Sequence, residues 1–464
     1  MPFSFRLSAF LLLSINIDND LTFGMLDVEY HKKARDVMTQ YVAGIDFGTT
    51  NSSAAISDGK VVRMVDVENG KDTIPTALFF PDKSNNVYYG RDAQKKYTDG
   101  DNPGRFMRSM KRVLGTSLMK GGTVINGKSM RFDAIVGYFV KYLKQKIDKA
   151  AGHDVESVVM GRPVHFRDDD PEGDRRAEQE LEKIALAAGF KQVAFQYEPI
   201  AAAFAHEQEI TSDKLAFVVD IGGGTSDFTV IRLSPDRKFA FDRTSDVLAN
   251  AGVRIGGNDF DKALSMKSFM PCFGLGTEYK SYNQNIYLPT APFISLSTWS
   301  SVNDVYNYKT LNMVKGYVVW GLEPEKTKRL YEIIENRLGH QNLDYVENAK
   351  IALSGVTEYD VKLDFLSDSP IIKTKRDIFE KAIEQDVKKI EIAVQECLKN
   401  ANVKNTDIEL VILTGGSTEI PYISRVMQSY FPNAKLSSEN KMASVGLGLA
   451  YDAMRRFCQN NKTR

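Results

Sequence analysis

Cysteine is scarce in this sequence: its 464 residues include only Cys272, Cys397 and Cys458. Three widely separated cysteines are too few for a disulfide framework and lack the spacing of a zinc site. We interpret them as small buried hydrophobic residues of a protein in a reducing compartment, which predicts a cytoplasmic location.

A charge excess of either sign is also missing. Lys and Arg together number 60, Asp and Glu together number 60, and the formal net charge is therefore zero. Proteins that hold nucleic acid or an anionic membrane by bulk charge carry a basic excess. We therefore expect neither nucleic acid nor a membrane as a partner. The hydrophobic content of 43% and the charged content of 26% are typical of a globular protein.

Long hydrophobic runs are missing as well, and the N-terminal apolar segment at residues 7–17 is short. A signal peptide is one interpretation of this segment, but Arg6 is the only charge before it and no small-residue cleavage site follows. We favour an extension that precedes the true start at Met25 or Met38. Residues 1–40 are therefore predicted not to be part of the fold.

Several catalytic motifs do not occur. Residues 122–129, GTVINGKS, match the spacing GxxxxGK[ST], but this pattern indicates a P-loop only where it joins a strand to a helix. No GxGxxG follows a strand and opens a helix, which argues against the dinucleotide-binding fold. HExxH, paired CxxC and GxSxG motifs are absent too, and the five histidines are scattered. Catalysis by histidine, cysteine or zinc therefore has no support in the sequence.

What is present is a pattern of strand, glycine turn and returning strand that occurs twice. In the first copy, the mainly apolar residues 41–47 include Asp46 near their end and are followed by the turn Gly48-Thr49-Thr50. In the second copy, the apolar residues 215–219 are followed by Asp220 and the turn Gly222–Thr225. The interval between the copies is far longer than a solenoid repeat. We therefore predict two related lobes, each with one such hairpin. A third glycine turn, Gly415-Gly416-Ser417, follows the apolar residues 410–413.

The two turns have the residues of a phosphate site. Consecutive glycines allow backbone N–H groups to surround an anion, and the threonine hydroxyls add donors. Asp46 and Asp220 would repel a phosphate unless a divalent cation lay between them. Either copy alone is explained by an ordinary hairpin with Asp as a turn residue, but the two together favour a magnesium nucleotide.

The rest of the chain predicts helices separated by short strands. Helical patterns cover residues 133–151, 172–188, 200–208, 377–402 and 445–457. Residues 270–325 differ, because they are rich in Tyr, Phe, Ser, Thr and Asn. The aromatic content argues against disorder, and we predict an ordered insertion within the second lobe.

Six blocks resemble the ATPase domain of the heat-shock protein 70 family, in the same order. They are GIDFGTTNSS (44–53), YEPIAAA (197–203), VVDIGGGTSDFTV (218–230), GGNDFD (256–261), ENAKIALS (347–354) and LTGGSTEIP (413–421). The chain is DnaK-like, and its insertion and the blocks GRPVHF (161–166) and FQYEP (195–199) resemble the YegD-type members, which end after the ATPase region.

The resemblance implies an α/β chain with the actin-like ATPase fold. In that fold two lobes, each with a ribonuclease-H-like core, bind a nucleotide in the cleft between them. Residues 41–214 would form lobe I, residues 215–438 lobe II, and residues 439–464 a C-terminal helix that returns to lobe I. The cofactors implied are ATP or ADP and Mg²⁺.

The resemblance also implies roles for individual residues. The expected catalytic residues are Lys111, Glu198, Asp227 and Thr225, and the expected ligands of a hydrated magnesium ion are Asp46 and Asp220. The expected phosphate contacts are Gly48, Thr49, Thr50, Asn51, Gly222, Gly223 and Gly224, and the expected adenosine contacts are Glu347, Lys350, Ser354, Gly415, Gly416 and Ser417.

The sequence departs from the family at the base. Glu419 and Ile351 stand where arginines are usual, and Lys441 stands where an acidic residue is usual. Losing two arginines removes stacking support for the adenine, so base specificity is in question. The sequence ends at Arg464, and we therefore expect a chain without a peptide-binding domain.

We therefore expect a chaperone-type, magnesium-dependent ATPase with low turnover. One alternative is a nucleotide-gated interaction protein with negligible turnover, in which residues 270–325 contact a protein partner. The other is a small-metabolite kinase on the same fold.

Overall fold

The computed structural model describes residues 41–98, 104–167, 170–240, 242–281, 284–437 and 443–458. The chain divides into two units, residues 1–40 and residues 41–464, and the description that follows concerns the second. The predicted N-terminal extension and the departure at Lys441 lie outside the described residues.

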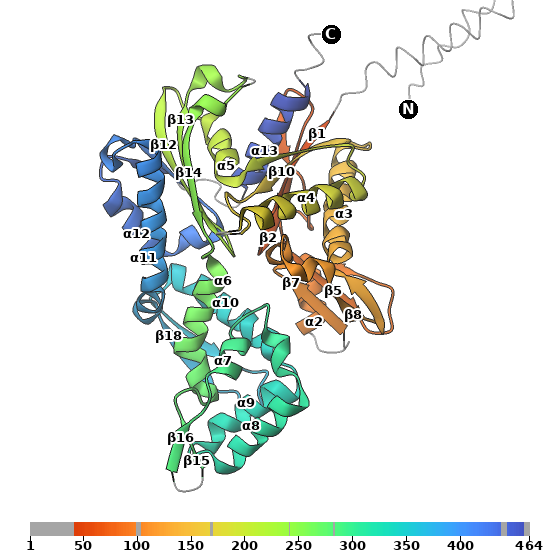
Figure 1. The fold of residues 1–464 in the computed structure, drawn as a ribbon, viewed down its shortest axis with the longest axis vertical. Helices are drawn as coiled ribbons and strands as arrows, with labels where there is room; N and C mark the ends of the chain where they lie inside the picture. The colour runs from red at the N-terminus through yellow and green to blue at the C-terminus, as the bar shows by residue number, and fades with distance from the viewer. Residues whose placement is uncertain are drawn as a thin grey trace, which may run out of the picture. The chain divides into compact units, whose positions relative to one another are not determined.

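The first large sheet is built around the first predicted hairpin (Figure 1). Its strands run in the order β11-β10-β1-β2-β3, and a short strand β4 also pairs with β2. β1 is antiparallel to β2 and parallel to β10. The strands are β1 (Val42–Phe47), β2 (Asn51–Ser57), β3 (Val62–Met64), β4 (Thr73–Pro75), β10 (Ser157–Arg162) and β11 (Gln192–Tyr197).

The second large sheet repeats this arrangement. Its order is β14-β13-β12-β19-β20, with β12 antiparallel to β13 and parallel to β19. The strands are β12 (Lys214–Ile221), β13 (Ser226–Leu233), β14 (Val247–Val253), β19 (Leu410–Thr414) and β20 (Lys435–Ser437). The predicted duplication is confirmed, because each glycine-turn hairpin forms the centre of a sheet of the same topology. We call the elements β1 to α5 the first lobe and β12 to β20 the second lobe.

Helices cover both sheets close to where the sequence places them. In α4 (Pro171–Ala188), Asp170 accepts a hydrogen bond from the Gly173 N–H at 2.8 Å at one end, and Gly189 ends the helix with a φ of 120°. The others are α3 (Phe132–Ala151), α5 (Glu198–Glu207), α11 (Arg376–Ala401), α12 (Pro421–Tyr430) and α13 (Ser444–Ala453). Helix α13 packs against α5 and against β1, β2 and β10, and a π-helical turn at Met454–Cys458 continues it.

A small sheet in the first lobe had no counterpart among the predicted elements. It has the order β6-β5-β7 and is followed directly by the 3-10 turn η1 (Met110–Val113). Its elements are β5 (Ala77–Pro81), β6 (Tyr88–Tyr89), α2 (Gly90–Thr98) and β7 (Gly104–Arg108). This sheet is important for the site, because β7 leads into the turn that contains Lys111.

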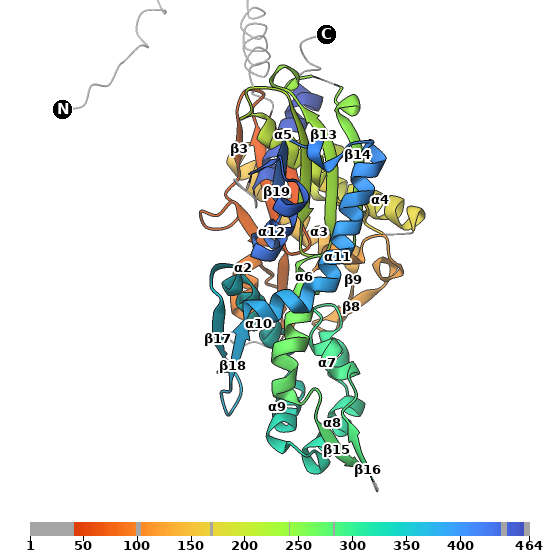
Figure 2. The same cartoon turned by 90° about the vertical axis from the view of Figure 1, so that its left-hand side faces the viewer.

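The aromatic-rich segment contains regular elements on both sides of residues 282–283. They are β15 (Glu278–Ser281), β16 (Gln284–Tyr287), α7 (Ala291–Leu296), η7 (Val302–Val305) and α8 (Tyr308–Trp320). In Figures 1 and 2 they lie at the opposite end from α5 and α13. They pack against α9 (Pro324–Glu335) and the start of α10 (Gly339–Gly355), where the Gly339 N–H donates to the Tyr306 hydroxyl at 2.8 Å.

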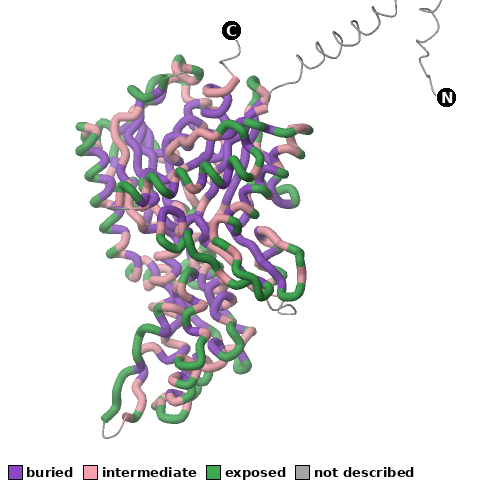
Figure 3. Tube along the Cα trace, turned by 45° about the vertical axis from the view of Figure 1, so that its right-hand side comes forward, coloured by how far each residue is buried: buried purple, intermediate pink, exposed green. Residues whose placement is uncertain are grey.

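The central strands of the two large sheets, β1, β2, β10, β12, β13 and β19, are mostly buried, and Figure 3 shows where buried residues lie along the chain. The largest hydrophobic cluster joins the second lobe and the aromatic-rich segment, and it also includes Phe79 and Phe106 of the first lobe. Side chains of the small sheet therefore pack into the core of the opposite lobe. In the described ranges, no helix has both the length and the hydropathy needed to cross a bilayer.

Candidate functional site

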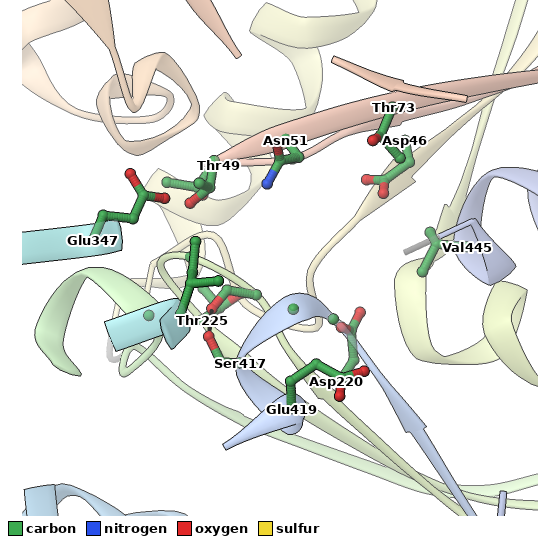
Figure 4. Close-up of a pocket in the computed structure, with 18 of the residues that line it drawn as sticks. Asp46, Thr49, Asn51, Thr73, Asp220, Thr225, Glu347, Ser417, Glu419 and Val445 are labelled. Carbon is green, nitrogen blue, oxygen red and sulfur yellow. Dashed lines mark hydrogen bonds between the residues drawn. The ribbon is translucent and has the colours of Figure 1, made fainter. Parts of the chain in front are cut away.

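A cavity of about 540 Å³ lies between the two lobes, within the size range of small-molecule sites. In Figure 4, Asp46, Thr49 and Asn51 line one wall, and Asp220, Thr225 and Ser417 line the other. Every residue predicted for the nucleotide, metal or catalysis lines this cavity except Gly224 and Asp227. The structure thus brings together residues that are hundreds of positions apart in the sequence.

The two phosphate turns face each other closely. Backbone hydrogen bonds hold the second turn, since the carbonyl of Gly222 accepts from the Gly257 N–H at 2.9 Å and that of Gly223 accepts from the Asn258 N–H at 2.8 Å. A Cβ on Gly223 would overlap the hydroxyl of Thr50 in the opposite lobe. Only glycine therefore allows this approach of the turns.

The third glycine turn lies against the second. Gly415 has a φ of 80°, in the left-handed region, and a Cβ there would overlap the carbonyl oxygen of Ile221. The hydroxyl of Ser417 donates to the carbonyl of Gly222 at 3.2 Å. The two turns of the second lobe therefore form one continuous wall of the cavity.

Lys111 is the buried cation of the site. Its side chain is only 7% exposed, and its ammonium forms an ion pair with Glu198, the first residue of α5. Burial works against the charged form, but the carboxylates of Glu198 and Asp46 outweigh it and raise the pKa of Lys111. The preceding Ser109 is buried with a left-handed φ of 58°, and this bend leads directly into the turn that contains the lysine.

Carboxylates outnumber cations around this lysine. Desolvation and the charge of Glu198 raise the pKa values of Asp46 and Asp227 to about 7. The pKa of Asp220 is raised well above its ordinary value by desolvation and then by Glu198, Asp227 and Asp46. Asp227 accepts a hydrogen bond from the Val164 N–H at 2.7 Å, which opposes this effect. One lysine thus faces four carboxylates.

This excess of negative charge fits a hydrated divalent cation. Magnesium prefers oxygen ligands, retains several waters and binds through one or two carboxylates together with substrate phosphates. Asp46 and Asp220 supply such oxygens from the two walls, and a cation between them would stabilise their ionised forms, which desolvation and then the charge of Glu198 disfavour. In the described part of the chain, no three His, Cys, Asp or Glu side chains converge to hold a metal by themselves.

The other end of the cavity is formed by α10. Lys350 forms an ion pair with Asp261 at 2.8 Å, and Glu347 is held 2.6 Å from the guanidinium of Arg108. Glu419 and Ile351, the residues that replace arginines, both line the cavity, and Ile351 is 59% exposed. The end expected to receive the base thus has two carboxylates at its wall and no arginine among its lining residues in the described ranges.

Some lining residues were not predicted. They are Ser52, Thr73, Gly257, Gly355, Ile420 and Val445. Gly257 begins α6 (Gly257–Leu264) within the GGNDFD block, and that block was the signal that could have identified it. Thr73 and Val445 lie outside every recognised block, and no sequence pattern points to them.

The family model described as "Hsp70 protein" matches residues 42–274 and 320–454. The match omits residues 275–319, which lie within the predicted insertion. It covers all six sequence blocks and every predicted site residue, so the resemblance does not depend on short motifs alone.

Curated relatives agree with this match. The chaperone protein DnaK of Mycoplasma mobile is 27% identical over 420 residues, which are 88% of this chain and 57% of the relative. DnaK of Thermotoga neapolitana is 26% identical over 426 residues, with 89% and 59% covered. DnaK of Mycoplasmopsis agalactiae is 26% identical over 423 residues, with 89% and 58% covered. The chain thus spans a little under three fifths of the length of these relatives.

Proposed function

The chain belongs to the Hsp70 protein family and has its actin-like ATPase fold, and from this premise we propose that it binds ATP with Mg²⁺ in the cavity between its lobes and hydrolyses it slowly. One observation carries the proposal: a buried lysine lies among four carboxylates, beside two glycine turns that face each other across the cavity. Phosphoryl transfer needs this combination of anion-binding backbone, positive charge and metal-binding carboxylates.

In the proposed reaction, water attacks the terminal phosphate of ATP and yields ADP and phosphate. Lys111 positions the attacking water and stabilises charge that develops on the phosphate oxygens, while Glu198 orients the lysine through their ion pair. The N–H groups of the glycine turns bind the remaining phosphate oxygens. When bound, Mg²⁺ at Asp46 and Asp220 supplies neutralising charge, and Asp227 and Thr225 orient water near the phosphate.

Calorimetry with ATP, ADP and GTP, each with and without Mg²⁺, tests the binding half of the proposal. We expect ATP and ADP to bind and the affinity to fall when Mg²⁺ is withheld, because the carboxylates then repel the phosphates. Equal affinity for ATP and GTP would locate the loss of specificity at Glu419 and Ile351. No heat of binding with any nucleotide would contradict the proposal.

A second candidate is a nucleotide-gated interaction protein without meaningful turnover. It is favoured by the large exposed hydrophobic side chains on the segment that the family model omits and at its border: Ile286, Tyr287, Ile294, Tyr308, Val319, Trp320 and Leu322. Such a surface fits a protein partner. Single-turnover measurement separates the two candidates, because binding of ATP without formation of ADP would support the second.

A further inference from the structure

Arg108 joins the two lobes at the end of the cavity away from Lys111. It ends β7 of the first lobe, and its guanidinium lies 2.6 and 2.8 Å from the two carboxylate oxygens of Glu347 on α10. Asp344, one turn earlier on the same helix, lies 3.4 Å away. The guanidinium also lies over the ring of Trp299, 4.4 Å from its centroid. We call Arg108, Trp299, Asp344 and Glu347 the cross-cleft clamp.

The clamp is a buried, charged contact. The side chain of Arg108 is 4% exposed. Burial disfavours its charge, but Glu347 and Asp344 outweigh this effect and raise its pKa, while Arg108 and Lys350 lower the pKa of Glu347 against the effect of burial. The pair is therefore ionised, and a charged hydrogen bond of this kind holds a carboxylate more firmly than a neutral one does.

Trp299 connects the clamp to the segment that the family model omits. It lies within residues 275–319, which the family model omits, and it is 8% exposed. Its ring is 5.9 Å from that of His340, whose Nδ1 lies 3.0 Å from the hydroxyl of Tyr97 in the first lobe. The indole N–H has no hydrogen-bond partner among the described residues. The ring of Trp299 therefore acts in the clamp through its contacts with Arg108 and His340 and not through a hydrogen bond.

Glu347 also lines the nucleotide cavity. A change at Trp299 can thus reach the cavity through two contacts, from the ring to Arg108 and from Arg108 to Glu347. The clamp places a cation from the first lobe behind Glu347, next to the wall where positions 351 and 419 of the second lobe are not arginine.

We propose that Arg108, held by the ring of Trp299, is a positioning residue for the nucleotide: it fixes the carboxylate of Glu347 in the cavity wall and keeps the lobes together at that wall. This inference rests on the proposed function, since Glu347 is expected to accept hydrogen bonds from the ribose. The segment at 275–319 then acts on nucleotide binding directly, in addition to any role as a partner surface.

The test uses the full chain and two variants that break the clamp, Arg108→Met and Trp299→Leu. The sequence contains two tryptophans, and the second, Trp320, is 59% exposed, so Trp320→Leu is a matched control. Dissociation of radiolabelled ATP with Mg²⁺ is followed after a chase with unlabelled ATP. Affinity for 2′,3′-dideoxy-ATP, which lacks the ribose hydroxyls, is measured beside that for ATP.

We expect wild type and Trp320→Leu to prefer ATP over dideoxy-ATP. In Arg108→Met and Trp299→Leu this preference should shrink by about tenfold, the factor that corresponds to one charge-assisted hydrogen bond, and ATP should dissociate faster by a similar factor. Arg108→Lys should recover only part of the preference, because lysine lacks the planar guanidinium whose two terminal nitrogens reach Glu347 and Asp344 separately. A merely destabilised variant would lose affinity for both nucleotides equally.

Two outcomes would overturn the inference in distinguishable ways. If wild type binds ATP and the clamp variants keep its dissociation rate and ribose preference, the clamp has no positioning role although the proposed function stands. If wild type binds no nucleotide, the proposed function falls and the coupling to the nucleotide falls with it. Tryptophan fluorescence measures the contact itself in the background Trp320→Phe, where Trp299 is the only tryptophan of the sequence. Adding Arg108→Met to this background must change the emission of Trp299. An unchanged emission would show that the clamp does not form.

Discussion

The two lobes meet at two places that differ in composition and in origin. At the phosphate end, glycine turns and the Lys111–Glu198 pair face each other, and all of these residues lie in recognisable sequence blocks or a segment that matches the family. At the clamp end, Arg108, Trp299 and His340 lie outside every block. The comparison teaches that one interface between lobes can combine a motif-bearing candidate site with a contact to a segment that lies outside the family match.

The two ends also differ in electrostatics. Asp46 and Asp227 have pKa values raised to about 7 by desolvation and a neighbouring carboxylate, so the ionised carboxylates are disfavoured there unless a cation neutralises them. At the clamp, Arg108 and Glu347 form a charged pair, while burial raises the pKa of Asp344 to about 7 and lowers the pKa of His340 to about 3. The phosphate end is thus arranged to receive ligands, and the clamp end is arranged to hold the lobes together.

The largest expected effect is at the phosphate end. Lys111→Ala should reduce single-turnover hydrolysis of ATP by about 100- to 1000-fold, because it removes the only buried cation facing the four carboxylates in the described site. Rapid-quench measurement of ADP formation checks this. Lys120→Ala, at an exposed position of the same lobe, is the control and should keep the wild-type rate. Equal rates in wild type and Lys111→Ala would remove the enzymatic half of the proposal.

The next effect concerns pH and the clamp end. The folded state holds His340 neutral down to about pH 3, whereas an unfolded histidine takes up a proton near pH 6.5. His340 therefore disfavours the folded state increasingly as the pH falls below about 6.5, by up to about 1.4 kcal/mol per pH unit.

Urea unfolding between pH 7 and pH 4 measures this loss. In His340→Gln the decline of the unfolding free energy should be shallower, because glutamine does not titrate. His165→Gln, at an exposed position, should follow wild type. An identical pH dependence in wild type and His340→Gln would mean that the clamp end is hydrated.

A smaller effect is expected at the glycine turns. Gly223→Ala places a Cβ onto the hydroxyl of Thr50 and forces the two lobes apart at the phosphate end, which should weaken binding of ATP with Mg²⁺ by about tenfold, the equivalent of the lower range of overpacking costs. Gly137→Ala is the matched control, since a Cβ there has no neighbour within 4 Å among the described residues. Calorimetry should give unchanged affinity for Gly137→Ala, and an unchanged affinity in both would show that the turns need not approach each other.

The smallest effect sharpens the difference between the ends. Ile351→Arg restores an arginine at an exposed position that lines the cavity, and a stacked guanidinium at such a site contributes about 0.5–1 kcal/mol, so ATP affinity should rise a few-fold. Ile392→Arg changes a similarly exposed isoleucine on α11 and should leave affinity unchanged. No gain from Ile351→Arg would mean that the base does not lie against α10.

Much of the fold could be predicted because its patterns are local. Helix α4 has a capping Asp170, a proline and a terminal Gly189, and its predicted start at Glu172 lies one residue from the observed one. The duplicated hairpins identify the centre of each sheet, and the helical period identifies α3 and α11. The small sheet β6-β5-β7 escaped prediction because its strands are short and carry no repeated turn signal.

The residues around the candidate site also fall into those that a sequence pattern predicts and those that it does not. Glycines, threonines and carboxylates that occur at strand ends in two copies have few explanations other than a phosphate site. Nearly all of the residues predicted in this way line the cavity. Arg108 and Trp299 are an ordinary arginine and an ordinary tryptophan in the sequence, separated by nearly two hundred positions. Their meeting depends on how β7 and the segment around η7 pack against α10.

The sequence by itself therefore determined the duplicated lobes, the phosphate turns and the family, because each depends on residue types at fixed local spacing. Only the tertiary structure decided that a cation of the first lobe, Arg108, holds Glu347 of the cavity wall and that the segment at 275–319 contacts this cation. The physical reason is that a buried guanidinium requires carboxylates and a ring from distant parts of the chain, and no local pattern in a sequence specifies such a convergence.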